Sequence, residues 1–132
     1  MTDLCKIFFP GDVVLLNNGI DLINRGKNIL KLTKELVNIE SVSNSQGVLE
    51  IGNYIHDMLE EWPYFQKNPG HLLKLPLRND KMNRFNLAAL VKGDKTSDKT
   101  VVYIGHMDTV DIGEYRDLKD FATQPAELME KL

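Results

Sequence analysis

Two stretches of the chain carry apolar residues at the spacing of an amphipathic helix. From about Lys27, apolar residues recur on one helical face and lysines on the other, at Ile29, Leu32, Leu36, Val37 and Ile39. ESVSNSQG interrupts this pattern, and Asn44 or Ser45 can cap a second helix. The second apolar stripe includes Val48, Ile51, Ile55, Met58, Leu59 and Trp62 and is ended by Pro63. The pattern therefore predicts two helices.

Three later stretches have the composition of strands. LLKLPL is a short candidate, and Pro76 places it at a sheet edge. FNLAALVKG and TVVYIG are joined by the polar GDKTSDK, which favours a hairpin between them. TVVYIG is apolar at consecutive positions, which predicts a central strand covered on both faces. Helices before strands, with one strand buried on both sides, predict an α/β fold with layered helix–sheet–helix architecture.

The two ends of the chain read differently from its middle. Residues 1–20 form a strand-prone leader that is closed by a turn signal at Asn17, Asn18 and Gly19, and its role is unclear. Residues 21–132 are interpreted as one domain, because 132 residues suit a single compact unit. The polar tail is expected to end in a short helix that starts at Pro125.

Charge and cysteine content exclude several classes of protein. The formal net charge is −3, and no stripe of Lys and Arg alternates with aromatic residues, so nucleic acid is not an expected partner. A single cysteine, Cys5, excludes an internal disulfide and a CxxC zinc site. The apolar IFFPGDVVLL is broken by Pro10 and Asp12, so neither a membrane span nor a signal peptide is expected. A cytoplasmic protein is the resulting interpretation.

The chemistry of the chain gathers at the end of the third candidate strand, VVYIGHMDTV. On an extended chain, His106 and Asp108 point to one side and Met107 to the other. His106 can bind a divalent metal while Asp108 accepts the proton of the other ring nitrogen or leans toward the metal. A His-x-Asp tripeptide alone is more typical of two surface residues. The preceding strand and Gly105 favour a metal site, because α/β folds place sites at the carboxyl ends of strands.

The order of these elements resembles the start of the M20 family of metallopeptidases. That family has a hydrophobic strand leading into Gly-His-x-Asp-x-Val, matched here by Gly105, His106, Asp108 and Val110. The IESVS stretch after the first helix is also similar to the family, and the resemblance covers about residues 27–112. The continuation DIGEYRDLKDFATQPAEL looks most like the bacterial arginine-utilisation branch.

The resemblance implies a zinc-peptidase-like mixed sheet and a hydrolase of amide bonds in peptides or acyl-amino acids. It implies that His106 is a zinc ligand and that Asp108 is the catalytic-site acid that orients it. The complete family enzyme holds two zinc ions through a bridging aspartate, a Glu-Glu pair and further ligands, none of which follows Asp108 here. We therefore expect the N-terminal part of a catalytic domain, with weak or absent zinc binding. His56, His71 and the Glu60-Glu61 pair are interpreted as surface groups.

Two hypotheses follow for the chain. The first is a fragment of an M20-type hydrolase that is inactive alone. The second is a stand-alone small α/β binding or regulatory module, and a downstream reading frame with a Gly-rich aspartate and a Glu-Glu pair would favour the first. Self-association is expected, because TVVYIG needs cover on both faces, whereas a stable monomer would favour the second hypothesis. The alternative is that residues 1–20 fold back as a substitute strand.

Overall fold

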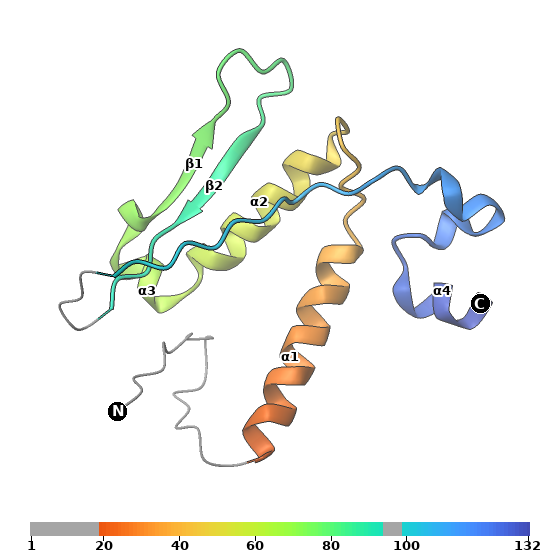
Figure 1. Ribbon diagram of the computed structural model, residues 1–132, viewed down its shortest axis with the longest axis horizontal. Helices are drawn as coiled ribbons and strands as arrows, with labels where there is room; N and C mark the ends of the chain where they lie inside the picture. Colours follow the sequence, from red (N-terminus) through yellow and green to blue (C-terminus); the bar gives the residue numbers. More distant parts are fainter. Residues whose placement is uncertain (1–18, 94–98) are drawn as a thin grey trace.

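A computed structural model describes the backbone of residues 19–93 and 99–132 (Figure 1). These residues combine helices with a two-stranded antiparallel sheet, which confirms the α/β class. The helices and strands are α1 (Gly19–Val37), α2 (Gly47–Glu60), α3 (Pro63–Lys67), β1 (Leu72–Pro76), β2 (Phe85–Ala89) and α4 (Pro125–Lys131). The connections include a 3₁₀ segment at Pro69–His71 and a 3₁₀ region at Ile112–Phe121, which is interrupted by a kink at Arg116.

Both amphipathic helices are confirmed, with different starts. Helix α1 begins at Gly19, earlier than Lys27, where the apolar period becomes regular. Helix α2 begins at Gly47, and the Ser45 hydroxyl accepts a hydrogen bond from the Gly47 N–H at 3.2 Å. The N-cap residue is Gln46, whose side chain makes no capping hydrogen bond, so the predicted cap by Asn44 or Ser45 is wrong. Ser45 lies one residue earlier, and its hydroxyl contacts only the first N–H of the helix. Pro63 lies after the end of α2 and is also the first residue of α3, a position that suits proline.

The sheet is a hairpin of β1 and β2, in register from Leu72 opposite Ala89 to Pro76 opposite Phe85. Its connection is closed by the Leu77 N–H, which donates to the Arg84 carbonyl at 2.9 Å. Within that loop the Asp80 carboxylate accepts from the Arg84 backbone N–H at 2.7 Å and from its guanidinium at 2.7 Å. The predicted strand in LLKLPL is therefore confirmed, as is the first half of FNLAALVKG.

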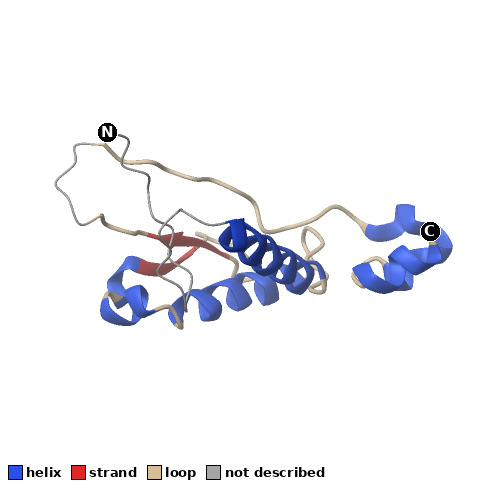
Figure 2. Cartoon of the chain, turned by 90° about the horizontal axis from the view of Figure 1, so that it is seen from below, coloured by secondary structure: helices blue, strands red, loops and turns tan. Residues whose placement is uncertain are grey.

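The predicted hairpin between FNLAALVKG and TVVYIG is wrong, as is the central strand covered on both faces. Strand β2 is hydrogen-bonded to β1 instead, and residues 100–105 are outside any strand. Val101, Val102, Tyr103 and Ile104 are between 73% and 94% exposed. The described residues supply neither a neighbouring strand nor a covering layer, so the apolar run has nothing to bury it. Figure 2 shows this segment as a loop that runs apart from the sheet.

The described core is small and lies where α2, α3 and β1 meet. Ile51, Phe65 and Leu72 are its buried apolar side chains, each 7% exposed or less. Helix α2 covers the sheet face that carries Leu72 and Lys74, whose ammonium donates to Asn53 of α2 at 2.8 Å. Leu73 and Leu75 alternate to the opposite face and are 45% and 46% exposed. One sheet face is thus packed against a helix, and the other presents leucines to solvent.

The two predicted ends have different outcomes. The short C-terminal helix from Pro125 is confirmed as α4. The predicted strands of the leader fall within residues 1–18, which lie outside the described residues. Most of the predicted polar turn, residues 94–98, lies outside them as well.

Candidate metal site at His106 and Asp108

The His-Met-Asp segment is attached to the loop between α1 and α2. Thr109 forms an isolated parallel bridge with Val42. The Thr109 N–H donates to the Ser41 carbonyl at 2.9 Å, and the Ser43 N–H donates to the Thr109 carbonyl at 3.0 Å. The apolar residues before His106 are exposed, but these two backbone hydrogen bonds fix the chain immediately after it.

Met107 faces helix α2, as the alternation of side chains along an extended chain predicts. A Cβ atom placed on Gly52 of α2 would lie 3.6 Å from the Met107 methyl carbon and 3.0 Å from the Phe85 ring. Gly52 therefore leaves the space that both side chains use. His106 and Asp108 lie on the other side, with Nδ1 of the imidazole 3.3 Å from Oδ1 of the carboxylate.

The surroundings of the His106 ring select one tautomer. Nδ1 lies 2.8 Å from the backbone carbonyl oxygen of Asp108 and 3.3 Å from its carboxylate. A carbonyl oxygen and an ionised carboxylate can only accept hydrogen bonds, so Nδ1 carries the proton. Nε2 is then an unprotonated donor atom on a side chain that is 85% exposed. This is the arrangement that a histidine ligand needs, with one nitrogen oriented by an acid and the other open.

Asp108 is held by a residue far away in the sequence. The Ser43 hydroxyl donates to its Oδ2 atom at 2.5 Å. This hydrogen bond is the main reason that the pKa of Asp108 is lowered from its ordinary value, and the neighbouring His106 ring lowers it further. The pKa of Arg84 is raised chiefly by its hydrogen bonds to Asp80, and the negative charge of Asp108 adds to this effect. The Arg84 guanidinium also donates to the Asn44 side chain at 3.1 Å. Asp108 is therefore a carboxylate that uses one oxygen for Ser43 and the other for His106.

The other two histidines are already hydrogen-bonded elsewhere. His71 Nδ1 lies 2.9 Å from the Tyr64 hydroxyl, and His56 Nδ1 lies 2.9 Å from Asp57 Oδ1. Within the described residues, ligand atoms of His56, Asp57 and Glu60 come within 4.8 Å of one another. The Lys74 ammonium is 3.9 Å from the Asp57 carboxylate and would repel a cation there. His56 and Asp57 are already hydrogen-bonded to each other, and Glu60 lies one helical turn after His56 on the same helix.

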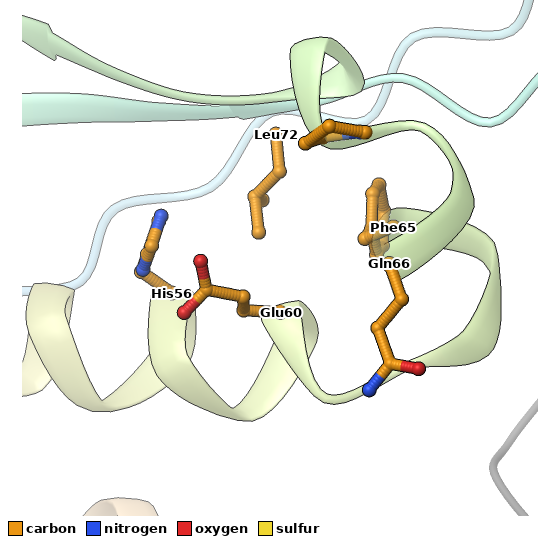
Figure 3. Close-up of a pocket in the computed structure, with 6 residues that line it drawn as sticks. His56, Glu60, Phe65, Gln66 and Leu72 are labelled. Carbon is orange, nitrogen blue, oxygen red and sulfur yellow. The ribbon is translucent and has the colours of Figure 1, made fainter.

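His56 is partly exposed, as predicted, and it also lines a pocket. Its side chain is 17% exposed and lines a pocket of about 300 Å³. Figure 3 shows His56 and Glu60 on the helix side of this pocket, across from Leu72 and Phe65. The spacing of four residues between His56 and Glu60, which places them on one helical face, was a signal available in the sequence. His106 is not among the residues that line the pocket.

The donor set around His106 fits one position of a metal site. Nε2 is open, but Asp108 is directed at the imidazole and at Ser43. Among the described residues, three potential metal ligands come together at His56, Asp57 and Glu60, and His106 is not one of them. Catalytic zinc commonly has three protein ligands. Residues 19–93 and 99–132 therefore bring together one histidine and its orienting acid, and the remaining ligands of such a site would come from elsewhere.

The sequence of this chain is similar to those of known proteins, and the similar region includes His106 and Asp108. The chain is similar to Protein RocB of Bacillus subtilis. The two are 35% identical over 111 residues, which is 84% of this chain and 20% of RocB. A continuous stretch of 111 residues in a chain of 132 cannot omit residues 22–111. The similarity therefore spans most of α1, together with α2, the hairpin and the His106–Asp108 segment.

A second relative gives the same result. The uncharacterized protein YqjN of Bacillus subtilis is 39% identical over 101 residues, which is 76% of this chain and 18% of YqjN. The chain thus spans about a fifth of the length of the curated relatives it matches. No family model matches the sequence, and no solved structure matches it. Among the described residues, no helix has the length and apolar character to cross a membrane.

Proposed function

We propose that this chain is the part of an M20-type metal-dependent hydrolase that supplies a histidine ligand, His106, and its orienting acid, Asp108. The observation that carries the proposal is the position of His106 Nδ1, which faces two hydrogen-bond acceptors and leaves Nε2 open. The proposed reaction is hydrolysis of amide bonds in peptides or acyl-amino acids, in a protein related to arginine utilisation. The proposed location is the cytoplasm.

Each residue has a defined task in this proposal. A bound zinc ion would supply an activated water for attack on the amide carbonyl. His106 would hold the metal through Nε2. Asp108 would keep the proton on Nδ1 and, through its negative charge, make the imidazole a better donor. The Ser41 and Ser43 backbone groups keep both side chains at the end of the extended segment by binding Thr109.

The length of the relatives supports a site completed by other residues. The matched region is about a fifth of RocB and of YqjN, which leaves most of each relative to provide further ligands and a general base. The bridging aspartate and the Glu-Glu pair of the M20 pattern are assigned to that remainder. The proposal accordingly includes weak zinc binding and no hydrolysis by residues 1–132 alone.

A binding module without catalysis is the second candidate function. It is favoured by the pocket of about 300 Å³ between α2, α3 and β1, which is lined by Leu72 and Phe65 as well as polar groups and does not include His106. The two candidates differ in where a ligand acts. A metal acting at His106 supports the hydrolase, whereas a small molecule that perturbs only Phe65 and Leu72 supports the module.

The test is a zinc titration of the chain followed by NMR of the histidine rings. We expect His106 Nε2 to shift on zinc addition, with an affinity weaker than micromolar, because water fills most of the coordination positions. His106→Ala should remove this response, and the matched control His56→Ala should keep it. A zinc response confined to His56, or no response at any ring, would contradict the proposal.

A further inference from the structure

Ser43 is the only described residue whose side chain donates a hydrogen bond to the Asp108 carboxylate apart from the His106 ring. Its hydroxyl lies 2.5 Å from Oδ2 and 3.1 Å from the Thr109 carbonyl. A hydroxyl has one proton to donate, and the shorter contact is also to the charged acceptor, which forms the stronger hydrogen bond. The Ser43 proton is therefore assigned to Asp108.

The backbone of Ser43 is fixed independently of its side chain. Its N–H donates to the Thr109 carbonyl at 3.0 Å, and two residues earlier the Ser41 carbonyl accepts from the Thr109 N–H at 2.9 Å. These two hydrogen bonds hold the loop against the end of the extended segment. The hydroxyl of Ser43 consequently reaches Asp108 from a backbone that is already in place.

The contact has a geometric effect on Asp108. An Asp side chain that is 39% exposed can rotate about its last bond, and water would accept either orientation. With Oδ2 bound to Ser43, Oδ1 is left at 3.3 Å from His106 Nδ1. A carboxylate held in this way stabilises the Nδ1–H tautomer and disfavours the tautomer in which Nε2 carries the proton.

We propose that Ser43 is a positioning residue that, by holding the Asp108 carboxylate, keeps His106 in the tautomer that presents Nε2 to a metal. The use of Nε2 as a ligand rests on the proposed function, whereas the effect of Ser43 on the tautomer does not. Because Ser43 and Asp108 are accessible to solvent, its loss should redistribute the two tautomers and not exchange one completely for the other.

Ser41 provides a matched control within the same loop. Its side chain is 1% exposed, and its hydroxyl has no hydrogen-bond partner among the described residues. The backbone of Ser41 binds Thr109 just as that of Ser43 does. Ser41→Ala therefore removes a hydroxyl from the same loop without touching Asp108.

The experiment measures the tautomer of His106 by the nitrogen chemical shifts of its ring. It is carried out at about pH 8, above the ordinary pKa of histidine. We expect the wild-type chain and Ser41→Ala to show mainly the Nδ1–H tautomer. Ser43→Ala should show a clearly larger fraction of the Nε2–H tautomer, and Ser43→Thr, which keeps a hydroxyl, should return toward wild type. A Ser43→Ala spectrum identical to wild type would overturn the proposal.

A second readout separates this proposal from the proposed function. If His106 is a ligand, Ser43→Ala should weaken zinc binding by about tenfold, the lower end of effects seen when a ligand's hydrogen-bonded neighbour is removed. A tautomer change in chains that show no zinc response at His106 would support the role of Ser43 and contradict the metal site. Zinc binding at His106 with no tautomer change in Ser43→Ala would support the metal site and contradict the role of Ser43. If Ser43→Ala does not fold, as judged by circular dichroism, Ser43→Cys replaces it, with the same direction of change expected.

Discussion

Gly47, the first residue of α2, packs directly against the backbone of Glu40. A Cβ atom at Gly47 would overlap the Glu40 carbonyl oxygen and lie 3.2 Å from the Ser41 Cα. The absence of a side chain at Gly47 thus allows the chain to turn from α1 into α2 beside Ser41 and Ser43, the two residues that bind Thr109.

Gly47→Ala should destabilise the fold although alanine is the better helix former. Alanine normally gains about 0.5–1 kcal/mol over glycine in a helix, but overlap with fixed backbone should produce a net loss of about 1–3 kcal/mol. Gly26→Ala in α1 is the matched control, because nothing lies within 4 Å of a Cβ there. It should stabilise the chain. Urea unfolding gives the free energy of unfolding of both variants. Equal changes in the two variants would contradict the close packing of Gly47 against Glu40.

Phe65→Ala should remove most of the stability of the folded chain. Phe65 is 3% exposed and forms an edge-to-face pair with Tyr64 at 5.3 Å between ring centroids. Loss of a buried phenylalanine costs about 3–5 kcal/mol, which is a large share of the stability of a small domain. Met129→Ala, at a side chain that is 77% exposed, should change the unfolding midpoint little. A cooperative transition that is unshifted in Phe65→Ala would show that the core lies elsewhere.

The hairpin loop should respond to acid through Asp80. Its pKa is lowered from the ordinary value, chiefly by the hydrogen bonds from Arg84. A lowered pKa in the folded state means that the contribution to stability is complete above the unfolded-state pKa of about 4 and is lost as pH falls through the lower folded value. Asp80→Asn should weaken the protection of the Arg84 amide from hydrogen exchange at neutral pH. In wild type this protection should fall in acid, and in Asp80→Asn that fall should be absent.

The exposed Asp117 supplies the control for this measurement. Asp117→Asn should leave exchange of the Arg84 amide and its acid dependence unchanged. An Arg84 amide that exchanges equally fast in wild type and Asp80→Asn would mean that the ion pair does not organise the loop.

The chain should self-associate through residues 101–104. Their side chains are apolar and at least 73% exposed, and the described residues offer this extended segment no backbone partner. A second copy can supply the missing strand by edge-to-edge pairing. Light scattering should show a mass that rises with concentration, and Ile104→Asp should reduce it. Met129→Asp, at an exposed residue of α4, should leave the mass unchanged. A monomeric mass for wild type at all concentrations would contradict this expectation.

Purified residues 1–132 should not hydrolyse dipeptides or acyl-amino acids in the presence of zinc. Hydrolysis needs a held metal, an activated water and a placed base, and the described residues around His106 provide one ligand and its orienting acid. The rate should equal that of His106→Ala. Zinc-dependent turnover that disappears in His106→Ala would show that the chain forms a complete site, either alone or between copies.

The helices could be predicted because their information is local. The apolar stripe of α2 recurs with a helical period, although the N-cap residue is Gln46 and not the predicted Asn44 or Ser45. The strand predicted over residues 101–105 was wrong for the opposite reason. Consecutive apolar residues indicate that a strand needs cover on both faces, but whether cover is present depends on segments distant in sequence.

In the candidate site, too, local relations could be predicted from the sequence and long-range contacts could not. The relation between His106 and Asp108 follows from alternation along an extended chain and was predictable from two positions. The Ser43 contact with Asp108 was not predictable, because Ser43 lies 65 residues from Asp108 in the sequence. The IESVS stretch marked only the end of a helix, and nothing local connected its second serine to an acid so far along the chain.

The same separation of 65 residues has a kinetic consequence. Closing a long loop costs chain entropy before any contact compensates for it, so long-range contacts tend to form after local helices and hairpins. Helix α2 and the β1–β2 hairpin join residues close in sequence, whereas the bridge between Val42 and Thr109 encloses both. The segment bearing His106 should therefore dock last during folding and detach first when the protein fluctuates, which makes amide exchange at Thr109 a direct reporter of whether the site is assembled.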